Sequence, residues 1–386
     1  MRTVAVVTVS RSDYGLYLSI LKRIRASNDL DLRLLVGGTH LAPAFGETIA
    51  DIQRDGFEIA ERVDTLPGSD SREDVAVAIG TATAAFARAL QRAQPDILVV
   101  LGDRFDMFAA AVAALPLTIP VAHIHGGELT EGAIDDTLRH CITKLSHLHF
   151  VANQAYARRV MQLGEEPWRV TVSGAPGLDD LTAGLSNPRE LEARLRLRLR
   201  KPVLLVTYHP VTLEPALTAV RVRELMAALR SVPGTIVFTG TNVDTGHRTI
   251  RAAIEEIVSS RPDTFFVENL GRRDYASLMA IADVMVGNSS SGIIEAPSVG
   301  LPVVNVGARQ RSRLRGVNVI DVDDDAAEIA AAIRRALIPR YRGALRGAPN
   351  PYGDGHAAER IVQRLATVAL DRQLLMKRFT DEEQRD

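Results

Sequence analysis

Short, almost wholly apolar runs recur along the first half of the chain, with longer amphipathic stretches between them. The apolar runs predict buried strands at residues 3–9, 30–36, 97–102, 119–124, 148–152 and 169–174. The clearest amphipathic stretch predicts a helix over residues 72–93. Continuous apolar strands joined by helices indicate a parallel sheet covered by helices on both faces.

The second half repeats this pattern. Its apolar runs predict strands at residues 202–208, 235–240, 264–270, 283–289, 302–307 and 318–322. The fold class is therefore α/β, with two doubly wound, Rossmann-like domains. Ligands of such sheets bind at the carboxyl ends of the strands, so we expect both rows of strand-end loops to face a central cleft.

Prolines and changes of pattern place the domain boundaries. The first domain is predicted to cover residues 1–175, followed by a linker at 176–201 that contains several prolines and the alternating run LRLRLR. The second domain is predicted at 202–355. A long amphipathic helix at 356–378 could pack back on the first domain, and residues 379–386 form a tail.

Composition narrows the class of protein. A chain of 386 residues favours two domains over one, because single cores stop growing at roughly 250–300 residues. The net charge of −1 gives no general attraction for nucleic acid or an anionic membrane. The single cysteine, Cys141, fits a reducing compartment, and no apolar run has the length of a signal peptide or a membrane span. We therefore expect a cytoplasmic protein without nucleic-acid or membrane partners.

The densest cluster of titratable groups is HIHGGELTEGAIDDTLRH at residues 123–140, directly after a predicted buried strand. Its carboxylates include Glu128, Asp135 and Asp136, and Asp103 follows the neighbouring strand in LGDRFD. Each acid alone could cap or complement a helix N-terminus. Together, acids from neighbouring strand ends should raise one another's pKa, which would place a proton donor beside a proton acceptor for acid–base catalysis.

Three histidines in the same stretch raise the question of a metal. His123 and His125 are two residues apart on an extended segment, whereas His140 lies in a predicted helix, and no HExxH-like spacing relates them. We therefore predict no metal site here.

The loop after the first strand reads SRSDYG. Ser12 or Asp13 could cap the following helix. Arg11 is less easily explained, because a cation at a helix N-terminus opposes the helix dipole unless an anion lies nearby. The turn GGTH at 37–40 is ordinary turn chemistry.

The second domain offers a site of the opposite kind. Hydroxyl groups and free backbone N–H groups in a serine-rich turn before a helix can hold a phosphate, although a plain N-cap has the same sequence. Glu295 could bind ribose hydroxyls, and the four arginines of residues 307–316 could pair with phosphate or coat a loop. The binding residues predicted here are Thr239, Asn242, Ser289, Ser290, Ser291, Gly292, Glu295 and Arg313, and His209, which follows a strand, is predicted to act in catalysis.

Taken together, these motifs resemble the hydrolysing UDP-N-acetylglucosamine 2-epimerases of bacterial sialic acid biosynthesis, and their relatives on the route to legionaminic acid. The motifs are SRSDYG, LGDRFD, the 123–140 stretch with its continuation, SGAPGLD, TYHPVT and GNSSSGIIEAPSVGLPVVNVGARQRSR. The resemblance implies a GT-B fold, a nucleotide-sugar substrate, a UDP product, no cofactor and a homodimer.

The resemblance also implies residue roles. Ser290, Ser291 and Gly292 would hold the diphosphate, with His209 beside it, Glu295 on the ribose and Arg11 facing the phosphates. Arg313 would contact phosphate. The acid–base groups would be Asp103, Glu128 and Asp136, with Asp135 as an adjacent alternative. His125 is predicted to contact the substrate, although it departs from relatives that have a carboxylate or glutamine at this position.

The implied reaction eliminates UDP to form a glycal and then adds water, which yields N-acetylmannosamine from UDP-N-acetylglucosamine. A UDP- or GDP-linked 2,4-diacetamido-trideoxy sugar is the alternative substrate. The rival functions are a GT-B glycosyltransferase, an epimerase that keeps the nucleotide attached, and a non-enzymatic sugar-nucleotide sensor.

Overall fold

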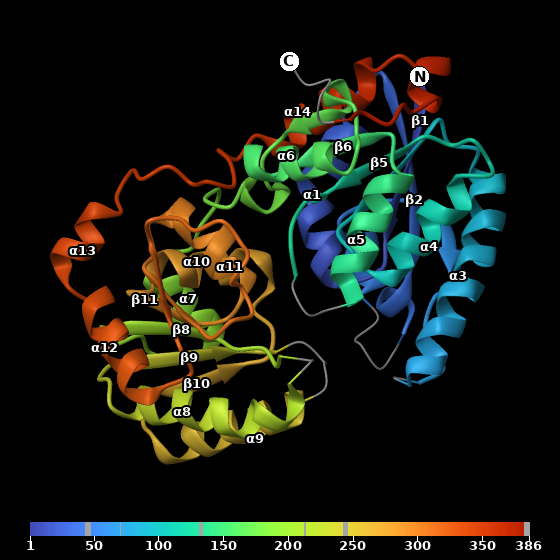
Figure 1. Ribbon diagram of the computed structural model, residues 1–386. Coiled ribbons are helices and arrows are strands. Elements are labelled where there is room, and N and C mark those ends of the chain that lie inside the picture. The colour runs from blue at the N-terminus through green and yellow to red at the C-terminus, as the bar shows by residue number, and fades with distance from the viewer. Residues whose placement is uncertain (43–47, 70, 131–133, 212–213, 242–245, 382–386) are drawn as a thin grey trace. The chain divides into compact units, whose positions relative to one another are not determined.

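The computed structural model describes the chain except residues 43–47, 70, 131–133, 212–213, 242–245 and 382–386 (Figure 1). Within the described residues, the chain divides into two compact units. Unit 1 contains Met1–Leu129, Ile134–Asp179 and the chain from Gly355 onward, and unit 2 contains Thr130 and Asp180–Asp354. Both units are parallel α/β sheets, so the predicted fold class is confirmed.

Unit 1 is built on a seven-stranded sheet of order β3-β2-β1-β4-β5-β6-β7. Its strands are β1 (Arg2–Thr8), β2 (Leu30–Gly37), β3 (Ile59–Val63), β4 (Ile97–Leu101), β5 (Val121–Ile124), β6 (Leu148–Val151) and β7 (Val170–Val172). Its helices are α1 (Arg11–Arg25), α2 (Ile49–Arg54), α3 (Arg72–Ala93), α4 (Phe105–Ala114), α5 (Ile134–Leu145), α6 (Gln154–Gln162), α14 (Ala357–Thr367) and α15 (Arg372–Leu375). Short 3₁₀ turns are η1 (Gly38–Leu41), η3 (Pro167–Arg169) and η4 (Pro176–Leu178).

Unit 2 has a six-stranded sheet of order β10-β9-β8-β11-β12-β13. Its strands are β8 (Val203–Thr207), β9 (Thr235–Thr239), β10 (Thr264–Val267), β11 (Val284–Gly287), β12 (Val303–Val306) and β13 (Val319–Val322). Its helices are α7 (Pro188–Leu195), α8 (Thr218–Arg230), α9 (His247–Ser260), α10 (Gly271–Ile281), α11 (Ser290–Ile294), α12 (Ala326–Ala336) and α13 (Pro339–Ala344), with 3₁₀ turns η5 (Pro215–Leu217) and η6 (Ala296–Val299).

Two elements differ from the sequence prediction. Strand β3 was not predicted, because its sequence IAERV buries only Val63 and so lacks the apolar run that marked the other strands. The single helix predicted at 356–378 is wrong. The chain instead forms α14, leaves helical geometry at Val368 and re-enters a short helix, α15, behind an Asp371 cap.

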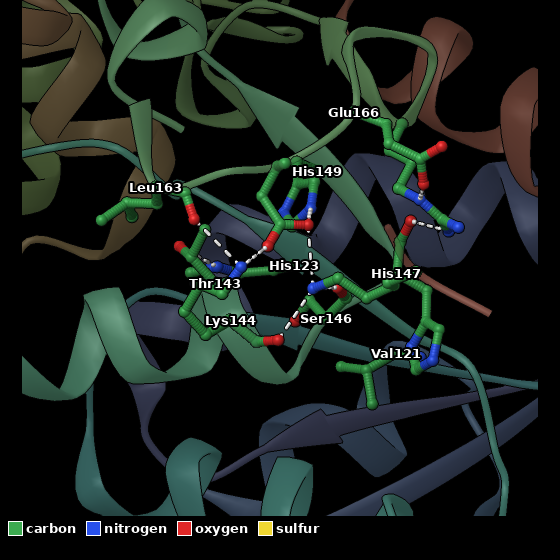
Figure 2. A network of polar contacts seen from close by, with 12 residues as sticks. Val121, His123, Thr143, Lys144, Ser146, His147, His149, Leu163 and Glu166 are labelled. Carbon is green, nitrogen blue, oxygen red and sulfur yellow. Dashed lines mark hydrogen bonds and ion pairs between the residues drawn. The ribbon is translucent and has the colours of Figure 1, made fainter. Parts of the chain in front are cut away.

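The C-terminal segment is part of unit 1. Apolar side chains of α14 lie in the same core as strands β1 and β4. Beyond α15, the ammonium of Lys377 donates to the carbonyls of Lys144 and Ser146, at 2.7 and 2.6 Å. It also pairs at 2.8 Å with Glu165, whose other partners include His149 and Lys144 in the buried network of Figure 2. No helix within the described residues is both long and apolar enough to cross a membrane.

Candidate active site

Asp103 lies in the loop after β4 and forms an ion pair with Arg139 of α5. The guanidinium is almost fully buried, with 4% of the side chain exposed, and its Nη1 lies 3.8 Å from Oδ1 of Asp136. Parallel pairing places Leu101 of β4 beside Ile124 of β5, so the two strands end at the same level. Arg139 therefore joins two of the predicted acid–base carboxylates.

The next strand end carries His125 and Glu128. His125 has a backbone φ of +67°, which is unusual for a residue other than glycine, and its N–H donates to the carbonyl of Phe150 at 3.0 Å. Its Nδ1 lies 2.7 Å from Oε1 of Glu128. At Gly127, where φ is +76°, a Cβ atom would lie 2.5 Å from the carbonyl oxygen of Tyr156. The turn can therefore close against α6 only with glycine at this position.

Asp135 and Asp136 occupy the first turn of α5, where carboxylates complement the helix dipole. Burial, and then the charge of Asp103, raise the pKa of Asp135 above its usual value. Asp136 lies 3.6 Å from Nε2 of His140, one turn further along the helix. The cluster therefore contains a carboxyl group that holds its proton more tightly than a solvated aspartate.

Helix α1 follows β1, and Arg11 is its first residue, with an exposed side chain. The predicted cap by Ser12 or Asp13 is wrong. Ser10 is the N-cap, and Asp13 at the third helical position returns a bond to the Ser10 backbone as the second half of a capping box. Oγ of Ser12 lies 2.8 Å from Oγ of Ser10 and does not cap the helix.

Asp13 is also part of a buried network that the sequence did not reveal. Its carboxylate accepts bonds from the Thr8 hydroxyl and the backbone of Val9, and burial raises its pKa to about 6. Nε2 of His40 lies 3.0 Å from the same Thr8 hydroxyl, and its Nδ1 lies 2.6 Å from Oγ1 of Thr48. The turn GGTH thus contributes a buried imidazole to the ends of β1 and β2.

In unit 2, His209 follows β8 and is held by Asn288 from the end of β11. The backbone N–H of His209 donates to Oδ1 of Asn288 at 2.7 Å, and Nδ2 of Asn288 donates to the His209 carbonyl at 2.9 Å. Burial, and then the charge of Arg309, lower the pKa of His209 to about 3, so the imidazole is neutral at physiological pH. The Thr239 hydroxyl pairs with that of Thr207 at 2.6 Å. Asn242 lies outside the described residues.

The serine-rich turn follows β11. Ser289 caps α11, and its Oγ lies 3.0 Å from that of Ser291, which in turn lies 2.5 Å from the Tyr275 hydroxyl. Ser290 is the first residue of the helix, and Glu295 is its C-cap.

Gly292 has a role in packing. A Cβ atom at this position would lie 2.9 Å from Cγ1 of Val303, so the glycine lets α11 approach β12.

Arg313 lies in the loop after β12, within a segment that bonds to the serine turn. Nη1 of Arg309 and Nε2 of Gln310 donate to the carbonyl of Asn288, at 3.1 and 3.0 Å. The backbone N–H of Arg313 donates to the Gln310 carbonyl at 3.1 Å. Asn288 therefore holds both the His209 loop and the arginine loop at one edge of the sheet.

The amino-acid sequence matches the model of a known family. The model of the UDP-N-acetylglucosamine 2-epimerase family matches residues 22–366. The chain belongs to the UDP-N-acetylglucosamine 2-epimerase family. The resemblance inferred from the sequence motifs is therefore confirmed.

Two individual relatives are similar to this chain over most of its length. The chain is 39% identical over 379 residues to the UDP-N,N'-diacetylbacillosamine 2-epimerase (hydrolyzing) of Legionella pneumophila, covering 98% of this chain and 99% of the relative. It is 37% identical over 324 residues to the GDP/UDP-N,N'-diacetylbacillosamine 2-epimerase (hydrolyzing) of Campylobacter jejuni, covering 83% and 84%.

A solved structure supports the fold. The UDP-GlcNAc 2-epimerase of Neisseria meningitidis bound to UDP-GlcNAc superposes with a TM-score of 0.77 at 19% identity, covering 94% of this chain and 99% of that one. The GT-B fold is thereby confirmed.

Within unit 1 of this family member, the structure gathers Asp103, Asp135, Asp136 and the pair His125–Glu128 near the ends of β4 and β5. Within unit 2, it gathers His209, the serine turn and the arginine loop around Asn288. Sequence reasoning missed Arg139, although its i+3 spacing from Asp136 was a usable signal. No group of three or more potential metal ligands occurs among the described residues.

Proposed function

We propose that the protein is a hydrolysing 2-epimerase of a UDP-linked 2,4-diacetamido-trideoxy sugar of the N,N'-diacetylbacillosamine type. It would convert the nucleotide sugar and water into UDP and the free sugar with inverted configuration at C2. The observation that carries this proposal is the acid–base cluster of unit 1, in which buried Arg139 contacts Asp103 and Asp136. The names of the two relatives described above support it.

We assign nucleotide binding to unit 2. Hydroxyl groups of Ser289, Ser290 and Ser291 would hold the diphosphate, and the neutral imidazole of His209 would donate one hydrogen bond to it. Glu295 would bind the ribose hydroxyls. Thr239, Gly292 and Arg313 would line the same site. Arg11 of unit 1 would contact the phosphates of the same substrate molecule.

The proposed chemistry begins with loosening of the anomeric C1–O bond, because the hydrogen at C2 is not acidic enough for direct removal. Preorganised donors stabilise the charge that develops on the leaving diphosphate. A base of unit 1 takes the C2 proton, the C–H electron pair forms the C1=C2 bond, and the C1–O electron pair leaves with UDP. A carboxylic acid, for which Asp135 is suited, then protonates C2 from the opposite face while water adds at C1.

The diacetylated sugar replaces UDP-N-acetylglucosamine as the first choice of substrate. N-acetylmannosamine would be the product only from UDP-N-acetylglucosamine, whereas both relatives at 37–39% identity are named for diacetylbacillosamine. UDP is preferred over GDP because the first of these relatives is named for UDP alone. A role in nonulosonic acid biosynthesis, such as that of sialic or legionaminic acid, would follow from the free product.

Incubation with each nucleotide sugar in D₂O, followed by NMR, tests the proposal. The expected result is free UDP and a free manno-configured sugar carrying deuterium at C2, formed faster from the diacetylated substrate. A glycosyltransferase would leave the substrate intact without an acceptor. An epimerase that keeps the nucleotide attached would deuterate C2 without releasing UDP, and a sensor would bind without turnover.

We further propose a homodimer formed through α3. This helix has no charged residue between Val75 and Ala87, yet Val77 is 57% exposed, and Leu115 after the adjacent α4 is 51% exposed. Burying such a face would be favourable at about 25 cal/mol per Å² of apolar surface. Light scattering should give the mass of two chains, and Val77→Asp should give that of one, whereas Arg88→Ala, at an exposed position beyond the uncharged part of the helix, should still give the mass of two.

A further inference from the structure

His125 and Glu128 form a buried hydrogen-bonded pair in the turn after β5. Both residues are almost fully buried, with 11% of the His125 side chain and 4% of the Glu128 side chain exposed. Oε1 of Glu128 lies 2.7 Å from Nδ1 of His125, three residues earlier in the turn. The carboxylate that sequence reasoning placed against the substrate is therefore directed at an imidazole.

This hydrogen bond fixes the tautomer of His125. An ionised carboxylate can only accept, so Nδ1 must carry the proton that the bond requires. In the neutral imidazole, Nε2 then holds a lone pair. Among the described residues, no hydrogen bond involves Nε2 of His125. The side chain therefore presents a proton acceptor at the ends of β4 and β5.

The backbone conformation of His125 also helps to fix the position of its imidazole. His125 holds a left-handed φ of +67°, which costs energy for a side chain other than glycine or asparagine. The bond from its N–H to Phe150 fixes this conformation at the end of β5. The result is an imidazole whose position and tautomer are both set before any substrate arrives.

We propose that His125 is the general base that removes the C2 proton, and that Glu128 is the positioning residue that orients it. In the step, the C2–H proton moves to Nε2 of His125. The C–H electron pair forms the C1=C2 bond, and the C1–O bond breaks with its electrons leaving on the diphosphate. The resulting imidazolium is stabilised by the Glu128 carboxylate. This assignment rests on the proposed function and replaces a carboxylate base with a carboxylate–histidine dyad.

The test uses His125→Gly in the full-length protein. Glycine accepts the left-handed backbone without strain and leaves room for an added imidazole. We expect turnover of the diacetylated substrate to fall about 10²–10⁴-fold with UDP affinity unchanged. Added imidazole should restore turnover at least partly, and should not restore Asp103→Asn. His125→Asn is the second variant, because asparagine tolerates this φ and can still donate to Glu128, but it lacks Nε2.

Glu128→Gln and the double variant separate the two roles. If Glu128 only orients His125, its loss should cost less than His125→Gly, and the double variant should be no slower than His125→Gly alone. Two results would overturn the assignment. One is His125→Gly or His125→Asn retaining more than about a tenth of the turnover, and the other is Glu128→Gln costing as much as His125→Gly with multiplicative losses in the double variant. Wild-type protein that releases no sugar would instead disprove the proposed function.

Discussion

Arg139 is ion-paired with Asp103, although one residue lies within helix α5 and the other in the loop that follows strand β4. The guanidinium is buried and the carboxylate is 23% exposed, so the pair lies at the boundary between the core and the surface of unit 1. Buried charges of this kind are stable only when they are paired. Each residue therefore fixes the other, and their separation along the chain kept this relationship out of the sequence analysis.

Arg139→Met should lower the free energy of unfolding by about 1–3 kcal/mol, because Asp103 would lose a charged partner in a partly buried site. Turnover should fall as well, since Asp103 and Asp136 would no longer share a cation. Arg139→Lys should recover more stability than turnover, because an ammonium lacks the planar fork that reaches two carboxylates. Urea unfolding and product assays measure both, and a wild-type-like Met variant would contradict the expectation.

Asp103→Asn should abolish turnover while leaving UDP binding intact. The amide keeps the shape of the side chain but cannot exchange a proton or hold the charge that pairs with Arg139, and loss of an acid–base group costs about 10²–10⁴ in rate. Asp64→Asn is the control, because Asp64 is an exposed aspartate of the same unit. Calorimetric titration with UDP and the sugar-release assay give the two readouts. Equal turnover in both variants would remove Asp103 from the mechanism.

His209→Ala should show the opposite pattern. Loss of one neutral hydrogen bond to the diphosphate should weaken UDP binding by about three- to tenfold, and turnover should fall with it. The backbone bonds between His209 and Asn288 do not depend on the imidazole, so the loop should stay in place. Thermal melting checks that point. Unchanged UDP affinity would place the nucleotide elsewhere.

The sequence predicted most of the fold because the central strands of both sheets are buried on both faces and leave an apolar signal. Strand β3, which is half exposed, gave no such signal. The sequence predicted the position of side chains that directly follow a strand, such as Asp103 after β4 and His209 after β8. What depends on contacts could not be predicted. The Asp13–Thr8–His40 network joins two strand ends. The hydrogen bond between Nδ1 of His125 and Glu128 forms across the turn that contains Gly127.

The C-terminal segment should be required for the stability of unit 1. Lys377 bonds to two carbonyls and to the buried carboxylate of Glu165. Lys377→Met would leave these groups without one of their donors, so we expect a loss of about 1–3 kcal/mol in unfolding free energy. Arg378→Met is the matched control, because that side chain is exposed. Equal melting temperatures for the two variants would show that the segment is only loosely attached.

Acidification should destabilise the protein steeply below pH 6.5. Burial lowers the pKa of His123 and His209 to about 3 and that of His40 and His147 to about 4. A lowered folded pKa means that the unfolded chain binds protons first, so stability is lost as pH falls from 6.5 toward these values. At pH 5, each such histidine should cost about 2 kcal/mol, partly offset by Asp13, whose raised pKa of about 6 acts in the opposite direction.

The decisive comparison is His123→Gln. In the wild type, Nε2 of His123 lies 2.8 Å from the Gly102 carbonyl, which requires the proton on Nε2 and leaves Nδ1 to accept from Thr143. A glutamine amide can donate to the same carbonyl but cannot be protonated. The variant should therefore be less stable than wild type at pH 7.5, yet lose less stability between pH 7.5 and 5. Urea midpoints at four pH values measure this slope, and parallel curves would mean that His123 does not contribute to the acid sensitivity.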